Sequence, residues 1–166
     1  MLEYRKAIVE EIDELKKILW KYGPNEWNYL TREGVNEEFA LVEQGYAQAI
    51  VATEGSEVVG FSVLIEGSLS PQYLSKYCSL NNMLFIGDVV VSSLHSGKGI
   101  ATQLLKECLA EAQRKNVNTV LIERHEENLA SAGMMRKAGF NIIDTFHDPE
   151  KRTVGSQNSV ILEFEI

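Results

Sequence analysis

The residues Gly97-Lys98-Gly99 separate a β-branched run from an apolar helical pattern. The run Val89-Val90-Val91 predicts a strand, and the residues after the glycines repeat along one helix face: Ile100, Leu104, Leu105, Cys108, Leu109 and Ala112. The first amides of a helix lack intrahelical partners and favour negative charge, and glycines let that backbone approach a ligand closely. The stretch from Ile86 to Thr102 therefore predicts a turn that binds phosphate. The alternative is a strand-to-helix turn in which the glycines only provide backbone flexibility and no ligand is bound.

The best-known phosphate motifs do not fit this stretch. A Walker loop requires GxxxxGK followed by serine or threonine, which the sequence lacks. A dinucleotide fingerprint GxGxxG requires glycine where Thr102 stands, and its turn follows the strand directly, whereas residues 92–96 intervene here. Both motifs are excluded by these particulars.

The composition indicates an acidic globular protein. The chain has 166 residues with 16 basic and 24 acidic side chains, and its net charge is −8. Its length and its 45 % hydrophobic content suit a single domain, residues 1–166. The charge argues against nucleic acid or a membrane surface as a partner and favours a cationic or amine-bearing substrate. No signal peptide or membrane-spanning run is evident, so we expect a cytoplasmic location. Cys78 and Cys108 are too few and too far apart for a zinc site, so we expect no metal.

Apolar patterns divide the chain into alternating strands and helices. Strands are predicted at residues 4–8, 46–53, 57–66, 85–91, 119–123, 140–145 and 160–166. Helices are predicted at residues 10–23, 31–45, 100–115 and 128–139, where Thr31 and Asn128 are N-caps and Gly45 and Gly139 are C-terminal stops. This order implies a mixed α/β sheet with helices on both faces.

Three motifs occur together in the second half of the chain. Val91 is followed, after four residues, by Ser96-Gly97-Lys98-Gly99-Ile100-Ala101. Asn128 and Ser131 come next, and Ala138-Gly139-Phe140 closes the following helix. In residue types, order and spacing the chain resembles the GNAT family of N-acetyltransferases. The resemblance covers essentially the whole chain in element order and is closest from Asp88 to Phe140.

The resemblance implies a mostly antiparallel sheet with a central pair of parallel strands that splay apart, here residues 85–91 and 119–123. Acetyl-CoA is expected to wedge between these strands as the co-substrate. The main chain of Val89 and Val91 is expected to pair with the pantetheine arm, and the amide of Val90 or Val91 to meet the oxyanion. Asn128 is expected to bind the same arm, and Met135 lies on the helix that lines the thioester end. The pyrophosphate is expected on the amides of Gly97, Lys98, Gly99, Ile100, Ala101 and Thr102, and Ser96 is counted among the cofactor-binding residues.

Transfer of an acetyl group to an amine requires a base, because most of the free amine is protonated at neutral pH. Asp88 stands where the family often carries a glutamate in this role, and it is the predicted catalytic residue. The alternative role for Asp88 is that of a solvated or helix-capping carboxylate without a part in catalysis. Glu123 and Glu66, at strand ends, either react or attract a cationic substrate. No cysteine lies near the motif, so attack by the amine is predicted to be direct.

The chain departs from the family pattern in two places. Ser96 replaces a usual glutamine or arginine, which weakens pyrophosphate binding, and His95 and Lys98 are candidates to supply the lost positive charge. Met135 replaces a frequent tyrosine that protonates the departing thiolate. Candidates for another acid are Tyr46, Tyr73, Tyr77 and His125. Otherwise the thiolate leaves unaided, or catalysis is slow or absent.

The acceptor is expected to be selected by residues 26–29, 67–82 and 147–158, which are irregular and polar. Trp27 and Tyr29 form either a lid over the site or a satellite of the core. Arg124 occupies a position that is usually aliphatic in the family, and its partner is left open between Asp88, Glu123 and the ligand.

The first functional hypothesis is an acetyl-CoA-dependent N-acetyltransferase that acts on a small-molecule or peptidic primary amine. The alternative is a catalytically weak or inactive acetyl-CoA-binding sensor or scaffold module, which Ser96 and Met135 favour. An unrelated nucleotide-binding protein is a third hypothesis, against which the excluded fingerprints argue. The oligomeric state is left open, and the alternating last strand, residues 160–166, is a candidate for pairing across a homodimer interface.

Overall fold

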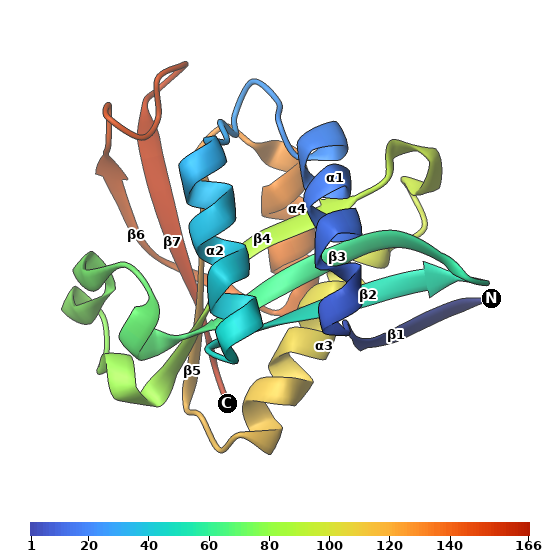
Figure 1. Cartoon of the computed structure of the whole chain (residues 1–166). Coiled ribbons are helices and arrows are strands. Elements are labelled where there is room, and N and C mark those ends of the chain that lie inside the picture. Colours follow the sequence, from blue (N-terminus) through green and yellow to red (C-terminus); the bar gives the residue numbers. More distant parts are fainter.

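The computed structural model describes all residues, 1–166, and contains one seven-stranded sheet with four α-helices (Figure 1). The strands are β1 Leu2–Lys6, β2 Ala47–Glu54, β3 Glu57–Glu66, β4 Met83–Val91, β5 Thr119–His125, β6 Asn141–His147 and β7 Asn158–Glu165. The helices are α1 Ile12–Tyr22, α2 Arg32–Gln44, α3 Ile100–Arg114 and α4 Leu129–Ala138. The strand order is β1-β2-β3-β4-β5-β7-β6, and only β4 and β5 pair in parallel. The predicted mixed, mostly antiparallel sheet with one central parallel pair is confirmed.

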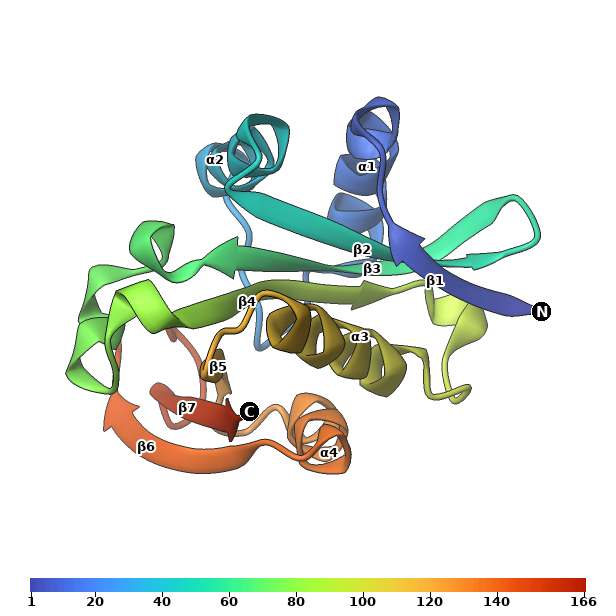
Figure 2. The same ribbon diagram turned by 90° about the horizontal axis from the view of Figure 1, so that it is seen from below.

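The helices cover both faces of the sheet. Figure 2 shows α1 and α2 on one face and α3 and α4 on the other. A core of 19 buried residues lies under α3 and α4, and a core of 18 lies under α1 and α2. Because both faces are covered, eight consecutive residues of β3 are buried. None of the helices is long and apolar enough to cross a membrane.

The predicted helix ends are confirmed by their capping geometry. Thr31 Oγ1 accepts from the Gly34 amide at 3.0 Å, and Asn128 Oδ1 accepts from the Ser131 amide at 3.2 Å. Gly45 and Gly139 close α2 and α4 in the left-handed conformation, which glycine adopts without steric cost. These local signals act over one helical turn, so the sequence alone was sufficient to predict them.

The apolar stripe predicted for α3 is buried at every position. Its cysteine, Cys108, lies 3.0 Å from the Ser62 hydroxyl, and burial raises the pKa of its thiol to about 12. Cys108 is therefore a core residue, as expected. The stripe fixes α3 against β2, β3 and β4, so that the first turn of α3 starts beside the end of β4.

Several boundaries differ from the predictions. The first strand lies two residues earlier, at Leu2–Lys6, because the chain turns into a short 3₁₀ helix at Val9. Strand β5 continues to His125, and β6 to His147. Residues 67–82 form three short 3₁₀ helices, in which the buried Leu74 fixes the segment to the core under α1 and α2.

The last strand, β7, is not an edge of the sheet. It pairs with β5 on one side and with β6 on the other, so its backbone groups are used within the chain. The predicted pairing of this strand across a dimer interface is therefore wrong. The two edges are β1 and β6. Alternation of residue types identifies a strand, but it does not show which strands lie beside it.

The parallel strands β4 and β5 pair only over their first halves. Met83–Ile86 of β4 pairs with Thr119–Ile122 of β5, and no pairing continues beyond them. A β-bulge at Gly87 lies at this point, because Val63 of β3 pairs with Asp88 and Leu64 pairs with Ile86. The bulge reverses the alternation of β4: Phe85 and Val90 both face α1 and α2. Asp88 thereby faces the same layer, whereas Val89 and Val91 pack toward α3.

Candidate functional site

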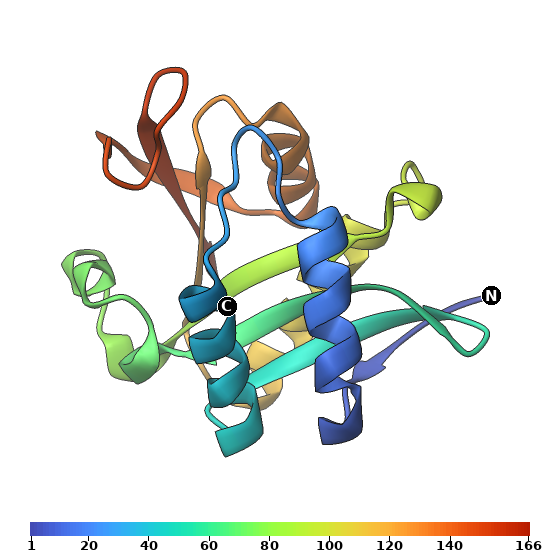
Figure 3. The same ribbon diagram turned by 45° about the horizontal axis from the view of Figure 1, so that its top comes forward.

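A cleft opens where β4 and β5 separate. Its walls come from the second half of β4, the end of β5, the start of α4, the α1–α2 connection and the β6–β7 loop. Figure 3 shows the α1–α2 connection reaching toward α4 and the β6–β7 hairpin at one end of the molecule. We call this the central cleft; among its lining residues are Asp88, Val89, Val90, Val91, Glu123, Arg124, His125, Asn128, Met135, Lys151 and Arg152. The predicted catalytic carboxylate thus lies together with five of the predicted cofactor residues.

A second, smaller concavity lies at the N-terminus of α3. This glycine hollow is lined by Val91, Ser92, His95, Ser96, Gly97, Gly99, Ile100, Ala101 and Thr102. Gly97 and Gly99 have φ angles of 80° and 75°, a conformation that residues with a Cβ rarely adopt. No side chain caps the first turn of α3, so its amides have no side-chain acceptor. Val91 lines both concavities, which makes the central cleft and the glycine hollow adjacent.

Lys98 and His95, which were predicted to supply positive charge to the hollow, lie near a carboxylate instead. Lys98 does not line the hollow, and its Nζ lies 3.6 Å from a carboxylate oxygen of Glu54 on β2. His95 Nε2 lies 3.5 Å from the same oxygen. Glu54 therefore opposes the positive charge that these side chains were predicted to supply to an anion. Sequence inspection missed Glu54 because the β2–β3 hairpin brings it there.

Asp88 lies against a second carboxyl group that sequence analysis missed. Glu38 of α2 places a carboxylate oxygen next to Gly87, where any Cβ would collide with it. The other oxygen of Glu38 is buried and has no hydrogen-bond partner. Burial and the adjacent Asp88 raise the pKa of Glu38 well above its ordinary value, which favours the protonated form of Glu38. Burial also raises the pKa of Asp88, and the hydrogen bond with Glu38 opposes part of that rise.

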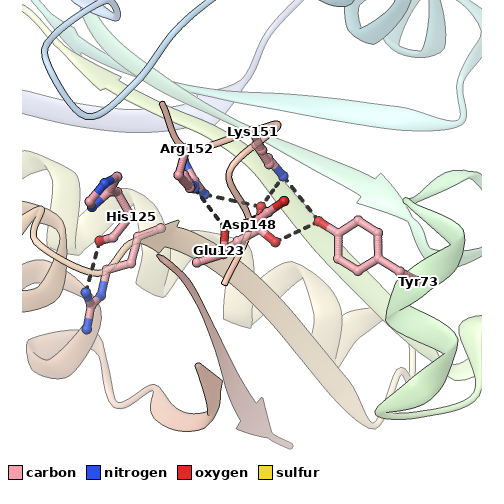
Figure 4. Close-up of polar contacts among 8 residues, drawn as sticks. Tyr73, Glu123, His125, Asp148, Lys151 and Arg152 are labelled. Carbon is pink, nitrogen blue, oxygen red and sulfur yellow. Dashed lines mark hydrogen bonds and ion pairs between the residues drawn. The ribbon is translucent and has the colours of Figure 1, made fainter. Parts of the chain in front are cut away.

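Glu123 of β5 belongs to a separate polar network (Figure 4). Tyr73 donates to Glu123 Oε1 at 2.7 Å, Arg152 Nη2 lies 3.3 Å from Oε2, and Lys151 forms an ion pair with the same oxygen. The Glu123 side chain is only 4 % exposed. Two cations therefore neutralise it, and it is not free to act as the base. The other alternative carboxylate, Glu66, lies outside the central cleft.

The polar loop between β6 and β7 is fixed to the cleft by the same network. Arg152 Nε donates to the Ser159 hydroxyl at 2.9 Å, and that hydroxyl donates to Asp148 at 2.8 Å. These bonds place Lys151 and Arg152 in the wall of the cleft. The sequence indicated an irregular polar segment here, but it gave no signal that the two cations turn toward Glu123.

His125 joins three segments that surround the cleft. Its Nε2 bonds the Val154 carbonyl at 2.8 Å, and its Nδ1 accepts from the Glu127 amide at 3.0 Å. This arrangement requires the neutral ring with its proton on Nε2, and it leaves neither nitrogen for proton transfer. The ring also packs on Trp27, with centroids 4.8 Å apart. Trp27 lines the cleft as expected of a lid, whereas Tyr29 is 83 % exposed and lies outside it.

The candidate tyrosine acids lie outside the central cleft. Tyr46 lines a different concavity, and Tyr73 and Tyr77 donate to Glu123 and Asp144. Burial and these carboxylates raise the pKa of both tyrosines. Tyr22, which sequence analysis did not single out, does line the cleft, and a hydrogen bond with Ser92 lowers its pKa. Met135 is 2 % exposed and carries no acidic proton, so α4 presents no acid to the cleft.

Arg124 pairs with neither Asp88 nor Glu123. Its Nη1 donates to the carbonyls of His125 and Glu126 at 3.1 and 2.8 Å. Its Nε is buried without a partner.

No group of three or more His, Cys, Asp or Glu side chains is arranged to hold a metal ion. The site is therefore a cleft with a half-buried acid pair on one face and a buried arginine at its wall.

Comparison with known proteins gives a consistent set of matches. The model of the acetyltransferase (GNAT) family matches residues 12–140. No curated protein matches the sequence. An acetyltransferase from Bacillus subtilis, solved in complex with CoA, shares 19 % identity with a TM-score of 0.75, covering 100 % of this chain and 99 % of that one. A ribosomal-protein-alanine N-acetyltransferase from Brucella melitensis shares 18 % identity with a TM-score of 0.76, covering 99 % of each chain. A Salmonella typhimurium protein solved with its cofactor acetyl-CoA shares 16 % identity with a TM-score of 0.74, covering 99 % of this chain and 94 % of that one.

Proposed function

The chain belongs to the acetyltransferase (GNAT) family, and from this premise we propose that residues 1–166 form an acetyl-CoA-dependent N-acetyltransferase. The observation that carries the proposal is that the central cleft and the glycine hollow lie side by side and share Val91. An elongated ligand with an anionic end and an uncharged arm fits such a path. Two proteins of the same fold were solved with CoA or acetyl-CoA, which supports this choice of ligand.

The ligand-binding roles are proposed from the hydrogen-bonding groups that each segment leaves without a partner. The first-turn amides of α3 have no side-chain cap and suit a pyrophosphate, because the helix N-terminus favours negative charge. Beyond the bulge, β4 has no partner on its β5 side, so the main chain of Val89 and Val91 is available to an extended arm. Asn128 uses its oxygen as the cap of α4, which leaves its amide nitrogen to donate. Met135 supplies an apolar wall at the end where the acetyl thioester is bound.

Asp88 is proposed as the base that takes a proton from the acceptor amine. It lines the cleft on the α1 and α2 face, and burial raises its pKa toward the range in which a base works best near neutral pH. The free amine then attacks the thioester carbonyl, and the amide of Val91 donates to the oxyanion, because the Val90 amide is turned toward β3. Glu38 keeps the Asp88 carboxylate in place by donating to it.

The acceptor is proposed to be a primary amine on a small molecule or a peptide. The net charge of −8 and the carboxylate of Asp88 favour a cationic group at the cleft. A similar structure is named a ribosomal-protein-alanine N-acetyltransferase, so a peptide N-terminus belongs in any substrate panel. The walls that contact the acceptor are the α1–α2 connection and the β6–β7 loop.

The second candidate is an acetyl-CoA-binding module without significant turnover. The observation that favours it is the buried Met135, together with the absence of any acid on the α4 face of the cleft.

Two measurements on the purified chain test these proposals. Isothermal titration should detect acetyl-CoA binding, and an absence of binding at about 1 mM ligand would exclude both candidates. A thiol-release assay over polyamines, amino acids, peptides and aminoglycosides should detect turnover with at least one amine. Binding without turnover over the whole panel would favour the binding module.

A further inference from the structure

Arg124 is a buried cation without an acidic partner. It is 9 % exposed, and none of the ion pairs in the structure involves it. Glu126, the first acidic residue after Arg124 in the sequence, is engaged elsewhere. Its carboxylate accepts a hydrogen bond from the side-chain amide of Asn158 at 3.0 Å. Burial lowers the pKa of Arg124, and the charge of Glu126 opposes only part of that effect.

One of its donors is also unused. Nη1 bonds two backbone carbonyls, but Nε is buried and has no acceptor. A buried donor without an acceptor is costly, and it is rare unless a ligand or water supplies one. Because Arg124 lines the central cleft, an acceptor inside the cleft can reach it. A negatively charged acceptor would remove both the unpaired charge and the unpaired donor.

Successive side chains of β5 point to opposite faces of the sheet, and this shows on which side of the cleft Arg124 lies. Ile122 belongs to the core under α3 and α4, and Leu121 to the core under α1 and α2. Arg124 is therefore on the α3 and α4 side, with Met135 and Asn128. Glu123 falls on the opposite side, where it engages Lys151 and Arg152. The base Asp88 also lies on that opposite side, so Arg124 faces the cleft from the side away from the base.

The proposed acetyl transfer produces an anion where Arg124 lies. The amine nitrogen forms a bond to the carbonyl carbon, its proton passes to Asp88, and the C–S bond breaks with its electron pair on sulfur. The groups that α4 presents to the cleft, which include Asn128, Ser131 and Met135, carry no proton acidic enough to neutralise a thiolate. We propose that Arg124 is a catalytic residue that pairs with the departing CoA thiolate, so that the leaving group needs no proton donor. This inference rests on the proposed function.

A titration of bound CoA tests the pairing without requiring turnover. The ultraviolet absorbance of the thiolate is followed against pH for CoA alone and for the protein–CoA complex. A cation beside the sulfur should lower the pH at which the bound thiol ionises, so that the thiolate fraction at neutral pH rises by about tenfold. Arg124→Met should abolish this rise, and Arg124→Lys, which keeps the charge, should retain most of it. Arg32→Met, at an exposed arginine outside the cleft, is the matched control and should behave as the unaltered protein.

The same titration can overturn the inference. If bound CoA ionises as free CoA does, or if Arg124→Met leaves the shift in place, Arg124 does not pair with the thiolate. Failure of the chain to bind CoA overturns the inference as well. Circular dichroism of each variant shows whether it folds, and Arg124→Lys provides the folded comparison if Arg124→Met does not.

Steady-state kinetics separate this inference from the proposed function. With an amine that the chain acetylates, Arg124→Met should lower kcat by about 100-fold, as expected for loss of one group that stabilises developing charge. The KM for acetyl-CoA should change little. Addition of Met135→Tyr to Arg124→Met should restore part of kcat, because the phenol supplies a proton to the thiolate. Turnover by the unaltered chain with no loss in Arg124→Met would refute the inference and leave the proposed function intact.

Discussion

Glu38 of α2 and Asp88 of β4 share a half-buried site beside Gly87, and the pKa values of both carboxyl groups are raised there. The arrangement depends on the bulge at Gly87, which turns Asp88 toward α2 and leaves room for the Glu38 carboxyl. Two carboxyl groups in contact cannot both ionise easily, so the pair carries one proton over a wide range of pH. The proposed base is thereby fixed in position by a hydrogen bond rather than by an ion pair.

The donor role of Glu38 predicts a different pH profile for two of its variants. Glu38→Leu removes the hydrogen bond that lowers the pKa of Asp88, so that pKa should rise. The acidic limb of the plot of kcat/KM against pH should then move to higher pH. Activity near pH 6 should then fall several-fold, while activity at alkaline pH is retained. Glu38→Gln keeps a donor and should leave the limb in place. Identical profiles for the two variants would show that Glu38 does not act through Asp88.

Replacement of the proposed base should remove most of the activity. Asp88→Asn preserves size and polarity but accepts no proton, so kcat/KM should fall by about 100-fold, within the range typical of general bases. The acidic limb of the pH profile should disappear with it. Acetyl-CoA affinity, measured by isothermal titration, should stay within about threefold of the unaltered chain. Unchanged turnover over the whole pH range would exclude Asp88 as the base.

The same pair predicts a stability that depends on pH. The pKa of Glu38 in the folded chain lies well above its ordinary value of 4.5, so the folded state keeps a proton that the unfolded state releases. Stability is therefore lost as pH rises from the ordinary pKa toward the folded one. Glu38→Gln removes this loss and should stabilise the protein at neutral pH, but not at pH about 4, where both states are protonated. A gain of about 1 kcal/mol would raise Tm by about 2–4 °C, measurable by calorimetry.

The close contact at Gly87 predicts that a side chain there displaces Glu38 and Ile65. A Cβ at Gly87 would collide with the Glu38 carboxyl and would lie 2.9 Å from Ile65 Cδ1. Gly87→Ala should therefore cost about 1–3 kcal/mol of unfolding free energy in a denaturant titration. Combination with Glu38→Ala, which vacates the space, should recover part of that cost. A simple sum of the two single losses would indicate that Glu38 is not the obstacle.

Glu54 is predicted to weaken binding at the glycine hollow. Its carboxylate lies within 3.6 Å of both Lys98 and His95, and it directs their charge away from an anion. Glu54→Gln should tighten acetyl-CoA binding by about two- to fivefold at low salt, as for a partly exposed charge, and the gain should shrink at high salt. Glu57→Gln, in the same hairpin, is the matched control. Equal affinities of Glu54→Gln and the control would contradict this role.

The sequence by itself determined the elements whose signals are local. The glycines at 97 and 99, the apolar face of α3 and the caps Thr31 and Asn128 each act within one or two turns of chain, so residue type and spacing suffice. The same spacing, together with Ala138-Gly139-Phe140, indicated the family that the comparison then showed.

Only the tertiary structure decided how the reactive groups face one another. The bulge at Gly87 sets which face Asp88 occupies, and it arises from the register with β3 rather than from any pattern within β4. The partners of Asp88 and Glu123 come from α2 and from the β6–β7 loop, and β7 is placed inside the sheet by pairing on both of its sides. Local propensities act between neighbours in sequence, whereas these contacts depend on strand order and register, which are set by the whole core.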